Sequence, residues 1–575
     1  MMITGAELFV KALRAEQVDT LFAYPGGQAI DLFNALYGVD DIDVILPRHE
    51  QGLVHAADGY ARSTGKVGVC LVTSGPGATN LVTGIATANY DCVPLVCFTG
   101  QVPINLIGND AFQEVDIVGI NRSITKYAVT VRRREDLAET IRKAFFIART
   151  GKPGVVLVDL PKDIQRAYGS EEYPEQVEIR GYRPNTSVHN GQINKAIEAL
   201  KQAKRPVFLI GGGVNISHAQ KEMLRLAEIT GVPVITTIMG KGAIPSTHDL
   251  YVGNIGIHGS YAANTAISKC DVLFSIGTRF NDRITGKIEQ FAPNATIIHV
   301  DIDSASISRN IIVDIPIVSD AKAAINALIE KAQPLEISKW RTRIDEWKKQ
   351  YPICHEKYGL TPEKIIAQIN RTFQNAVIST DVGQNQLWAT QFLELNEYKQ
   401  LLTSGGLGTM GYGFPAAIGA KLGNPEKDVI VIAGDGGMQM NIQEMATAIV
   451  YELPIVICVL NNGYLGNVRQ WQEMFFDKRY SSTCLRYRKS CISNCNKPTK
   501  CCPEYTPDFI KLAESYGARG IRVTDEAEIT AALEAAKDTH KVPTIIEFII
   551  EREQNVMPIV PPGNALEDMI MESED

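Results

Sequence analysis

The stretch from Val429 to Gly466, VIVIAGDGGMQMNIQEMATAIVYELPIVICVLNNGYLG, holds two apolar runs separated by a glycine turn and a helical pattern. This order predicts a βαβ unit with two parallel strands, and we expect its helix to begin near Asn441. Asp435 and Asn462 each follow the carboxyl end of one of these strands. Open parallel sheets bind their ligands at that edge. The stretch therefore predicts both a fold class and a ligand site.

Similar apolar runs alternate with helical patterns along the whole chain of 575 residues. Continuous apolar strands are typical of parallel sheets covered by helices on both faces, so the predicted fold class is α/β, with doubly wound parallel sheets. Two stretches lack the alternation, residues 166–190 and 333–358, and we interpret them as linkers. The expected domains are then residues 1–165, 191–332 and 359–550, followed by a tail at 551–575.

The net charge of −8 and the lack of a long apolar run argue against two classes of protein. A non-specific nucleic-acid binder needs clustered Lys and Arg to neutralise phosphates, and a membrane span needs about 18 consecutive apolar residues. The first residues predict an amphipathic helix opened by Thr4 rather than an export signal. Six scattered cysteines in mostly apolar surroundings favour a reducing compartment. We expect a cytoplasmic protein that binds neither nucleic acid nor a membrane.

The side chains of Asp435 and Asn462 supply oxygen atoms, which are the ligands that Mg²⁺ prefers. The glycines after Asp435 free backbone N–H groups at a helix start, where phosphate groups bind. No GxxxxGK[ST] motif is present, so the sequence does not support a P-loop nucleotidase. Either motif alone is as often a simple turn or a strand-end loop. The two together at this spacing favour a site for Mg²⁺ and phosphate.

The GDG and NN motifs at this interval resemble the magnesium–diphosphate motif of thiamine-diphosphate enzymes. The resemblance implies the fold of that family, and it implies that Mg²⁺ is held by Asp435, Asn462 and the backbone carbonyl of Tyr464. The segments YPGG, DVGQNQLW and SGGLGTMGYG match the same family. Together these motifs imply a set of residues that bind thiamine diphosphate: Tyr24, Pro25, Glu50, Gly383, Gln384, Asn385, Gly408, Met410, Asp435, Gly436, Gly437, Asn462 and Gly466.

Glu50, in PRHEQG at the start of a predicted helix, is the candidate catalytic carboxylate. Thiamine chemistry needs a carboxylate beside N1′ of the aminopyrimidine to move a proton. A lone Glu is usually a solvated surface group. This one lies between YPGG and TSGPGATN, in a segment that resembles the aminopyrimidine-binding domain of the family, and it falls at the family's activating glutamate. The resemblance implies further catalytic roles for Gly27 and Gln113.

Motifs along nearly the whole chain, among them TGAELFVKAL, GNDAFQE, NIQEMATA and VRQWQEMFF, resemble the large, catalytic subunits of the acetohydroxyacid synthase family, also called acetolactate synthases. The middle third carries LIGGGV, GTRFNDR, HVDID and VSDAK, which resemble the FAD-binding elements of its biosynthetic members. GGG after a strand is by itself a weak signal. The implied FAD-binding residues are Gly211, Gly212, Gly213, Thr237, His258, Gly277, Arg279, Arg283, Asp301, Ile302 and Asp320.

The resemblance also implies a reaction, in which pyruvate loses CO₂ and the remaining two-carbon unit adds to a second 2-ketoacid. The products are 2-acetolactate or 2-aceto-2-hydroxybutyrate, in the first common step of valine, leucine and isoleucine biosynthesis, and FAD has no net redox role. Arg283 and Trp471 match the pair that selects the acceptor, and Phe112 completes the substrate site. Arg suits a carboxylate, and Trp can shape a pocket for a short alkyl group. The implied partners are further copies, in a homodimer or tetramer with shared active sites, and a small regulatory subunit.

Five positions depart from the family pattern. Asn385 stands where His is usual and Gly437 where Ser is usual, so two hydrogen bonds to the diphosphate are expected to change. Asn281, Lys152 and Ile257 replace Asp, Arg and Met. These departures bear on affinity and inhibitor response and leave the reaction class as expected.

Two alternative functions stay open on the sequence. One is another thiamine-diphosphate enzyme, such as a pyruvate oxidase, a decarboxylase or glyoxylate carboligase. The last of these lacks the activating glutamate, so Glu50 argues against it. The other is a non-catalytic cofactor-binding or metal-sensing protein, and intact Glu50, Asp435 and Asn462 weigh against it.

The segment from Cys484 to Cys502, CLRYRKSCISNCNKPTKCC, holds five of the eleven cysteines. Set against the family it is an insertion, spanning residues 484–505, in the segment that closes over the active site in relatives. Its spacing is not the two-by-two CxxC of a standard zinc site, yet four thiolates could hold Zn²⁺ or an iron–sulfur cluster. We expect a reduced, mobile loop ahead of a bound metal, and a bound metal ahead of a disulfide.

Overall fold

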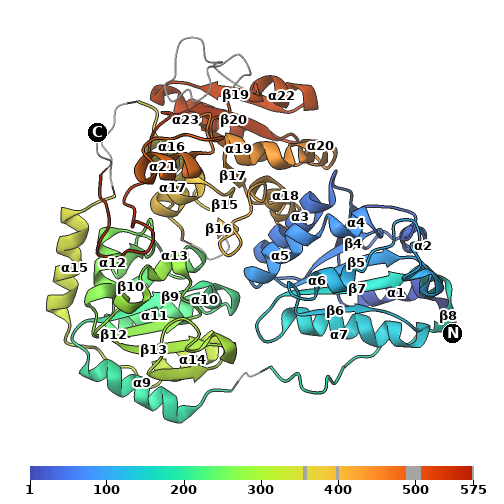
Figure 1. The fold of residues 1–575 in the computed structure, drawn as a ribbon, viewed down its shortest axis with the longest axis horizontal. Coiled ribbons are helices and arrows are strands. Elements are labelled where there is room, and N and C mark those ends of the chain that lie inside the picture. The colour runs from blue at the N-terminus through green and yellow to red at the C-terminus, as the bar shows by residue number, and fades with distance from the viewer. Residues whose placement is uncertain (185–186, 354–358, 397–400, 487–506, 573–575) are drawn as a thin grey trace.

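The computed structural model describes residues 1–575 except 185–186, 354–358, 397–400, 487–506 and 573–575. Three six-stranded sheets, each with all strands parallel, follow one another along the chain, and helices cover them (Figure 1). The outer two sheets each carry two apolar cores, and the middle sheet shares one large core with the helices around it. The prediction of an α/β protein with three doubly wound sheets is confirmed. None of the helices in the described residues is long and apolar enough to cross a membrane.

The N-terminal sheet has the strand order β3-β2-β4-β5-β7-β6. Its strands are nearly continuous apolar runs, because helices pack on both faces. The strands are β2 (Thr20–Ala23), β3 (Asp43–Ile45), β4 (Gly68–Val72), β5 (Leu95–Gln101), β6 (Tyr127–Thr130) and β7 (Val155–Pro161). The helices are α1 (Gly5–Ala15), α2 (Ile30–Leu36), α3 (Glu50–Thr64), α4 (Pro76–Thr79), α5 (Val82–Tyr90), α6 (Ile117–Asn121), α7 (Leu137–Arg149) and α8 (Lys162–Arg166).

The first residues of the chain join this domain by an added strand pair. β1 (Met2–Thr4) pairs antiparallel with β8 (Tyr168–Ser170), which lies in the segment expected to be a linker. Thr4 then caps α1, as predicted, because its hydroxyl accepts from Glu7 N while the Glu7 carboxylate accepts from Thr4 N. Residues 168–170 are therefore part of the N-terminal structure.

The central sheet has the order β11-β10-β9-β12-β13-β14, which is the strand order of dinucleotide-binding doubly wound folds. The strands are β9 (Pro206–Ile210), β10 (Val234–Thr236), β11 (Tyr251–Asn254), β12 (Val272–Ile276), β13 (Thr296–Asp301) and β14 (Ile315–Val318). The helices are α9 (Asn190–Gln202), α10 (Gly212–Ile216), α11 (Gln220–Thr230), α12 (Tyr261–Lys269), α13 (Asp282–Thr285), α14 (Ala321–Ile329) and α15 (Ser338–Gln350).

The C-terminal sheet, β16-β15-β17-β18-β20-β19, repeats the strand order of the N-terminal one. Each has its strands in the sequence order 2-1-3-4-6-5, so the outer domains share a topology that the middle one lacks. The strands are β15 (Val377–Thr380), β16 (Leu401–Leu402), β17 (Val429–Gly434), β18 (Ile455–Asn461), β19 (Arg519–Val523) and β20 (Thr544–Ile549). The helices are α16 (Pro362–Thr372), α17 (Gln384–Phe392), α18 (Gly413–Gly423), α19 (Asp435–Met438), α20 (Met445–Val450), α21 (Gly466–Phe475), α22 (Phe509–Tyr516) and α23 (Ile529–Lys537).

The helix expected near Asn441 begins elsewhere. α19 starts at Asp435 and lasts one turn, a 3₁₀ stretch follows, and α20 starts only at Met445. Asn441 interrupts the helical path with φ −133° and ψ 37°, and its amide donates to the carbonyl oxygen of Gly411 at 2.7 Å. This tertiary hydrogen bond takes the place of a regular turn.

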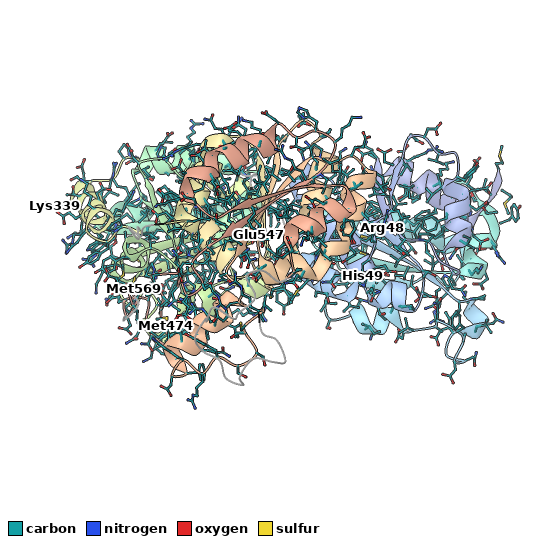
Figure 2. All side chains as sticks on the ribbon, turned by 90° about the horizontal axis from the view of Figure 1, so that it is seen from above. Arg48, His49, Lys339, Met474, Glu547 and Met569 are labelled. Atoms are coloured by element: carbon teal, nitrogen blue, oxygen red, sulfur yellow. The ribbon has the colours of Figure 1, made fainter. Side chains whose placement is uncertain are left out.

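The N- and C-terminal domains pack through α3 and α18. The two backbones approach closely at glycines: a Cβ built on Gly59 would lie 2.0 Å from the Ala416 carbonyl oxygen, and one built on Gly419 would lie 1.8 Å from that of Ala56. Figure 2 shows Arg48 and His49, just before α3, at the place where these two domains meet. Any side chain at either glycine would push the two helices apart.

Two segments expected outside the domains pack onto them. α15, within 333–358, buries Trp340, Ile344 and Trp347 in the core of the central domain. The tail after residue 550 runs from the C-terminal sheet down to the central one (Figure 1), where Leu566 joins the central core and Val560 N donates to the carbonyl of Ile257. The tail thus ties the third domain to the second.

Candidate active site

The metal edge is the part of the C-terminal sheet where the sequence predicts a Mg²⁺ site. It lies at the carboxyl ends of β17 and β18, which are neighbours in the sheet. The Asp435 carboxyl is buried, and its Oδ2 has no hydrogen-bond partner among the described residues. Burial raises the pKa of Asp435 to about 7. Asn462 Oδ1 accepts from Tyr464 N at 3.1 Å, and its amide donates to Gln384 Oε1 at 3.1 Å. A buried carboxylate oxygen without a partner, beside an amide oxygen, fits a hard cation.

Asp381 explains the glycine at position 437. The Asp381 carboxylate accepts from Gly411 N and Gly413 N at 3.0 Å each. A Cβ built on Gly437 would lie 2.1 Å from Asp381 Oδ1. A larger residue at 437 would therefore displace the carboxylate that orders the glycine-rich loop.

Gly383, Gln384 and Asn385 follow β15 at the same edge of the sheet, and the side chains of Gln384 and Asn385 are already engaged. The Gln384 amide donates to Gln470 Oε1 and to the Gln554 carbonyl, both at 3.0 Å. The Asn385 amide donates to the carbonyls of Asp381 and Ile432 at 2.7 and 3.0 Å. Both N–H groups of each amide are thus satisfied within the protein, which leaves backbone groups for a diphosphate.

The loop after β16 brings Gly408 and Met410 to this edge. Gly408 has φ +74°, which suits glycine, and among the described residues no atom lies within 4 Å of a Cβ built there, its chain neighbours aside. Met410 Cε lies 3.5 Å from the Cβ position of Gly436. Open space above a glycine and a Met beside the metal edge fit the face of a flat ligand.

Glu50 begins α3, as the sequence predicts. Its Oε2 accepts from Asn80 Nδ2 at 2.9 Å, and its other oxygen lies 3.5 Å from the Cβ position of Gly77. Glu444, from the C-terminal domain, accepts from His49 N at 3.0 Å, just before the helix. No hydrogen bond or ion pair in the described part of the chain joins Glu50 to the metal edge.

The other predicted N-terminal site residues lie near Glu50. Tyr24, Pro25 and Gly27 follow β2 at the same end of the sheet. Gln113 packs on Gly75, and its neighbour Phe112 has 84% of its surface exposed. Tyr24, Pro25, Gly27 and Glu50 thus lie on the same domain as Phe112 and Gln113.

Arg283 and Trp471 come together from different domains. The Arg283 guanidinium carbon lies 6.0 Å from the centre of the Trp471 ring. Trp471 is on α21, which begins at Gly466, and a Cβ on that glycine would lie 2.8 Å from Asn462 Nδ2. The helix α21 therefore connects the predicted acceptor pair to the metal edge.

A cavity of about 890 Å³ lies between the N-terminal and central domains. It opens at the carboxyl ends of β9 and β12, the point where the strand order of the central sheet reverses. Nine of the predicted FAD residues line it: Gly212, Gly213, Thr237, Gly277, Arg279, Arg283, Asp301, Ile302 and Asp320. The other two predicted FAD residues, Gly211 and His258, do not line the cavity.

Gly211 and His258 instead contact neighbouring segments of the chain. A Cβ on Gly211 would lie 2.2 Å from the Gly277 carbonyl oxygen, so this glycine allows two turns to pack. His258 Nδ1 is 3.1 Å from the carbonyl oxygen of Pro558 in the tail. At the cavity wall, Asn281 Oδ1 is buried without a hydrogen-bond partner in the described residues. The volume and this polar atom fit a dinucleotide-sized ligand.

The beginning of the cysteine-rich insertion docks on the metal edge. Leu465 N donates to the Thr483 carbonyl, and Leu485 N donates to the Gly463 carbonyl, both at 2.8 Å. These two bonds bracket Tyr464, whose carbonyl is a predicted metal ligand. Cys484 itself accepts from Arg552 at 3.6 Å. The remaining cysteines of the cluster lie outside the described residues, as do the metal, disulfide and loop alternatives that depend on them.

The sequence matches three domain families of thiamine pyrophosphate enzymes: the N-terminal TPP binding domain over residues 3–120, the central domain over 193–328 and the C-terminal TPP binding domain over 381–548. It is 46% identical to the probable acetolactate synthase large subunit of Methanocaldococcus jannaschii, over 98% of this chain and 95% of the relative. The chain belongs to the acetolactate synthase large-subunit family.

Two bacterial members of the family match over almost the whole chain. The large subunit of Haemophilus influenzae is 42% identical, over 99% of this chain and 98% of the relative. The isozyme 3 large subunit of Escherichia coli is 41% identical over the same shares. The family resemblance predicted from the motifs is confirmed.

Sequence reasoning missed three buried carboxylates, Asp381, Glu444 and Asp91, and the largely buried Arg62 that pairs with Asp91. Burial raises the pKa of Asp381 to about 6 and also raises that of Glu444. In the sequence, Asp381 directly follows an apolar strand, which is a usable signal. Asp91 and Arg62 give no such signal, because their roles depend on contacts between domains.

Proposed function

We propose that this chain is the catalytic subunit of an acetolactate synthase. It would convert two pyruvate molecules and a proton to 2-acetolactate and CO₂, or use 2-oxobutanoate as the acceptor to form 2-aceto-2-hydroxybutyrate. The observation that carries this proposal is the approach of Arg283 to Trp471, beside the helix that starts at the metal edge. A guanidinium next to an aromatic wall suits the carboxylate and the short alkyl group of a 2-ketoacid.

The residues support three cofactors: thiamine diphosphate, Mg²⁺ and FAD. Thiamine diphosphate, when bound, supplies the electron sink for decarboxylation. Asp435, Asn462 and the Tyr464 carbonyl would hold Mg²⁺, and the backbone around Gly436 would bind phosphate. No group of three or more His, Cys, Asp and Glu side chains gathers in the described residues, which agrees with a site built on one carboxylate, an amide and a main-chain carbonyl. FAD would fill the 890 Å³ cavity.

Glu50 would move a proton at N1′ of the aminopyrimidine, and this role supports a shared site. Within the chain its carboxylate accepts from Asn80, and Glu444 accepts from the backbone N–H groups of Arg48 and His49 just before its helix. A second copy that presents its metal edge to Glu50 would complete the site and cover Phe112. We therefore propose a homodimer, or a tetramer of such dimers. The large-subunit names of the relatives support a small regulatory partner.

The deciding experiment supplies the purified chain with thiamine diphosphate, Mg²⁺, FAD and pyruvate, and identifies the product. We expect acetolactate. Acetaldehyde or acetyl phosphate as the main product would contradict the proposal and indicate one of the alternative thiamine-dependent enzymes.

The acceptor preference is tested by competition between pyruvate and 2-oxobutanoate. Trp471→Leu should erase any preference for the larger ketoacid, because it removes the ring that faces Arg283. Phe476→Leu is the matched control, since this neighbouring aromatic residue is 54% exposed. An unchanged product ratio in Trp471→Leu would remove this residue from acceptor selection.

A further inference from the structure

The dipeptide Gly405–Gly406 lies where the three domains meet. From the N-terminal domain, the Asp91 carboxylate accepts from Gly405 N at 3.1 Å and from Gly406 N at 2.8 Å. From the central domain, Met239 Sδ lies 2.3 Å from the Cβ position of Gly405, and Arg279 Nη2 lies 3.3 Å from that of Gly406. A side chain at Gly405 would displace Met239, and one at Gly406 would press on the Asp91 carboxylate at 2.7 Å.

Arg62 holds Asp91 in this position. Its guanidinium donates to Asp91 at 3.0 Å and to Asp58 at 2.7 Å, and its third contact is the carbonyl oxygen of Thr403 at 2.9 Å. Both carboxylates are buried. A buried network in which every group has its hydrogen-bond partners is rigid. Truncating one member leaves the buried charges of the others unpaired.

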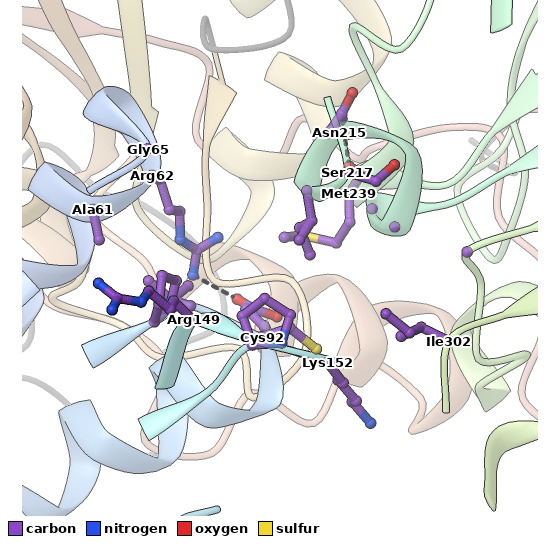
Figure 3. A pocket seen from close by; sticks show the side chains of 18 of the residues that line it. Ala61, Arg62, Gly65, Cys92, Arg149, Lys152, Asn215, Ser217, Met239 and Ile302 are labelled. Atoms are coloured by element: carbon purple, nitrogen blue, oxygen red, sulfur yellow. Dashed lines mark hydrogen bonds and ion pairs between the residues drawn. The ribbon is translucent and has the colours of Figure 1, made fainter. Parts of the chain in front are cut away.

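The same network lines the large cavity. Arg62, Asp91, Met239, Arg279 and Gly405 are all among the lining residues. Figure 3 shows Arg62 and Met239 on opposite sides of this cavity. The dipeptide therefore has the proposed flavin site on one side, and the loop that carries the proposed thiamine-binding residues follows it directly in the sequence.

We propose that Asp91, held by Arg62, is a positioning residue that couples filling of the cavity to the placement of the loop carrying Gly408 and Met410. The inference rests on the proposed function, which assigns FAD to the cavity and thiamine diphosphate to the loop. A ligand that packs against Met239 and Arg279 restricts the dipeptide to the arrangement that Asp91 holds. Thiamine diphosphate needs the loop in that arrangement, so each cofactor favours the binding of the other.

Calorimetry on the full-length protein with excess Mg²⁺ tests this coupling without catalysis. Thiamine diphosphate affinity is measured with and without FAD, and FAD affinity with and without thiamine diphosphate. We expect each cofactor to tighten the other by the same factor, because linkage is reciprocal, and by at least about fivefold. In Asp91→Asn, which keeps the size but loses the charge and one acceptor, both factors should fall towards one.

Two further variants keep the test decisive. Gly406→Ala disturbs the same contact from the other side, since its Cβ would lie 2.7 Å from Asp91 Oδ1, and it should lose the coupling as well. Asp159→Asn is the control. This carboxylate is also buried in the N-terminal domain, where it accepts from Thr99 and Gln101, and it does not line the cavity.

The outcomes separate this inference from the proposed function. Three results would overturn the inference. The first is coupling between the cofactors that stays unchanged in both Asp91→Asn and Gly406→Ala. The others are an equal loss of coupling in the control Asp159→Asn, and independent binding of the two cofactors to the wild type. A wild type that binds both cofactors with coupling but makes no acetolactate contradicts the proposed function alone. A wild type that binds no FAD contradicts both.

Discussion

Glu50 owes its position to residues far away in the sequence. Asn80 donates to its carboxylate, and Glu444 binds the backbone at the start of its helix. The carboxylate therefore has a fixed direction before any ligand arrives, as proton transfer by a positioned group requires.

Glu50→Gln should lower the rate of acetolactate formation by about 100-fold or more, because the amide cannot take up the proton. The rate is measured at saturating thiamine diphosphate and Mg²⁺. Glu139→Gln, the same change on the exposed face of α7, is the control and should keep the wild-type rate. Near-normal turnover in Glu50→Gln would exclude the proposed role of this carboxylate.

His55 is a buried residue with a predictable effect on stability. It lies fully inside the interface between α3 and α18, edge-on to Tyr412, and neither ring nitrogen has a hydrogen-bond partner in the described residues. Burial lowers its pKa from 6.5 to about 3. Below pH 6.5 the unfolded chain therefore takes up a proton that the folded chain does not. The free energy of unfolding consequently decreases as the pH is lowered.

His55→Phe should remove this acid sensitivity. The free energy of unfolding of the wild type should decrease relative to the variant by about 1.4 kcal/mol per pH unit below pH 6.5, with a constant difference above pH 7.5. Denaturant unfolding between pH 5 and 8 measures it, and the exposed His540→Phe serves as control. A difference between the two proteins that does not change with pH would contradict the neutral state of His55.

At the scale of elements, the strand ends carry most of the site. All the apolar runs that predict strands form strands, because a buried parallel strand must be apolar along its whole length. The short outer strands β6, β11, β14, β16 and β19 were not predicted. They lie at or beside sheet edges, where half-buried strands need fewer apolar residues.

The start of the insertion pairs with residues 463–465, the loop that carries the predicted metal ligand Tyr464. This pairing leads to a prediction at the scale of elements. Leu485→Pro removes the N–H that donates to the Gly463 carbonyl, which fixes the turn before Tyr464. We expect Mg²⁺ to bind about fivefold more weakly in the presence of thiamine diphosphate, since one hydrogen bond contributes about 1 kcal/mol. Calorimetric titration with Mg²⁺ measures the change.

Leu485→Ala is the matched control for this variant. It keeps the backbone N–H and loses only the side chain, which lies 3.4 Å from the Cβ position of Gly436. Equal weakening in both variants would mean that the side-chain contact, and not the backbone pairing, stabilises the metal loop.

At the scale of the whole molecule, the two halves of the proposed site lie on different domains of one chain, and in the described residues no hydrogen bond or ion pair joins Glu50 to Asp435 or Asn462. Glu50 accepts from Asn80 of its own domain, whereas Gly436, next to Asp435, faces Met410 of the loop after β16 and Leu485 at the start of the insertion. The proposed dimer would bring the two halves together from different copies.

Mixing two inactive variants tests the shared site. Glu50→Gln and Asp435→Asn, dissociated and reassembled in equal amounts, should regain about one quarter of wild-type activity, because half the dimers are mixed and one of their two sites is intact. Each variant reassembled alone is the control. No recovery after confirmed subunit exchange would place both residues in one chain's own site.

The sequence by itself determined the fold class, the family and the strand-end motifs, because apolar runs, glycine turns and oxygen ligands are local in the chain. The tertiary structure alone decided the roles of Asp91, Arg62, Asp381 and Glu444. A buried charge is stable only with partners, and theirs come from other domains or distant loops. It likewise placed Gly211 against Gly277 and His258 against Pro558, since only the folded chain shows which neighbours a strand-end residue meets.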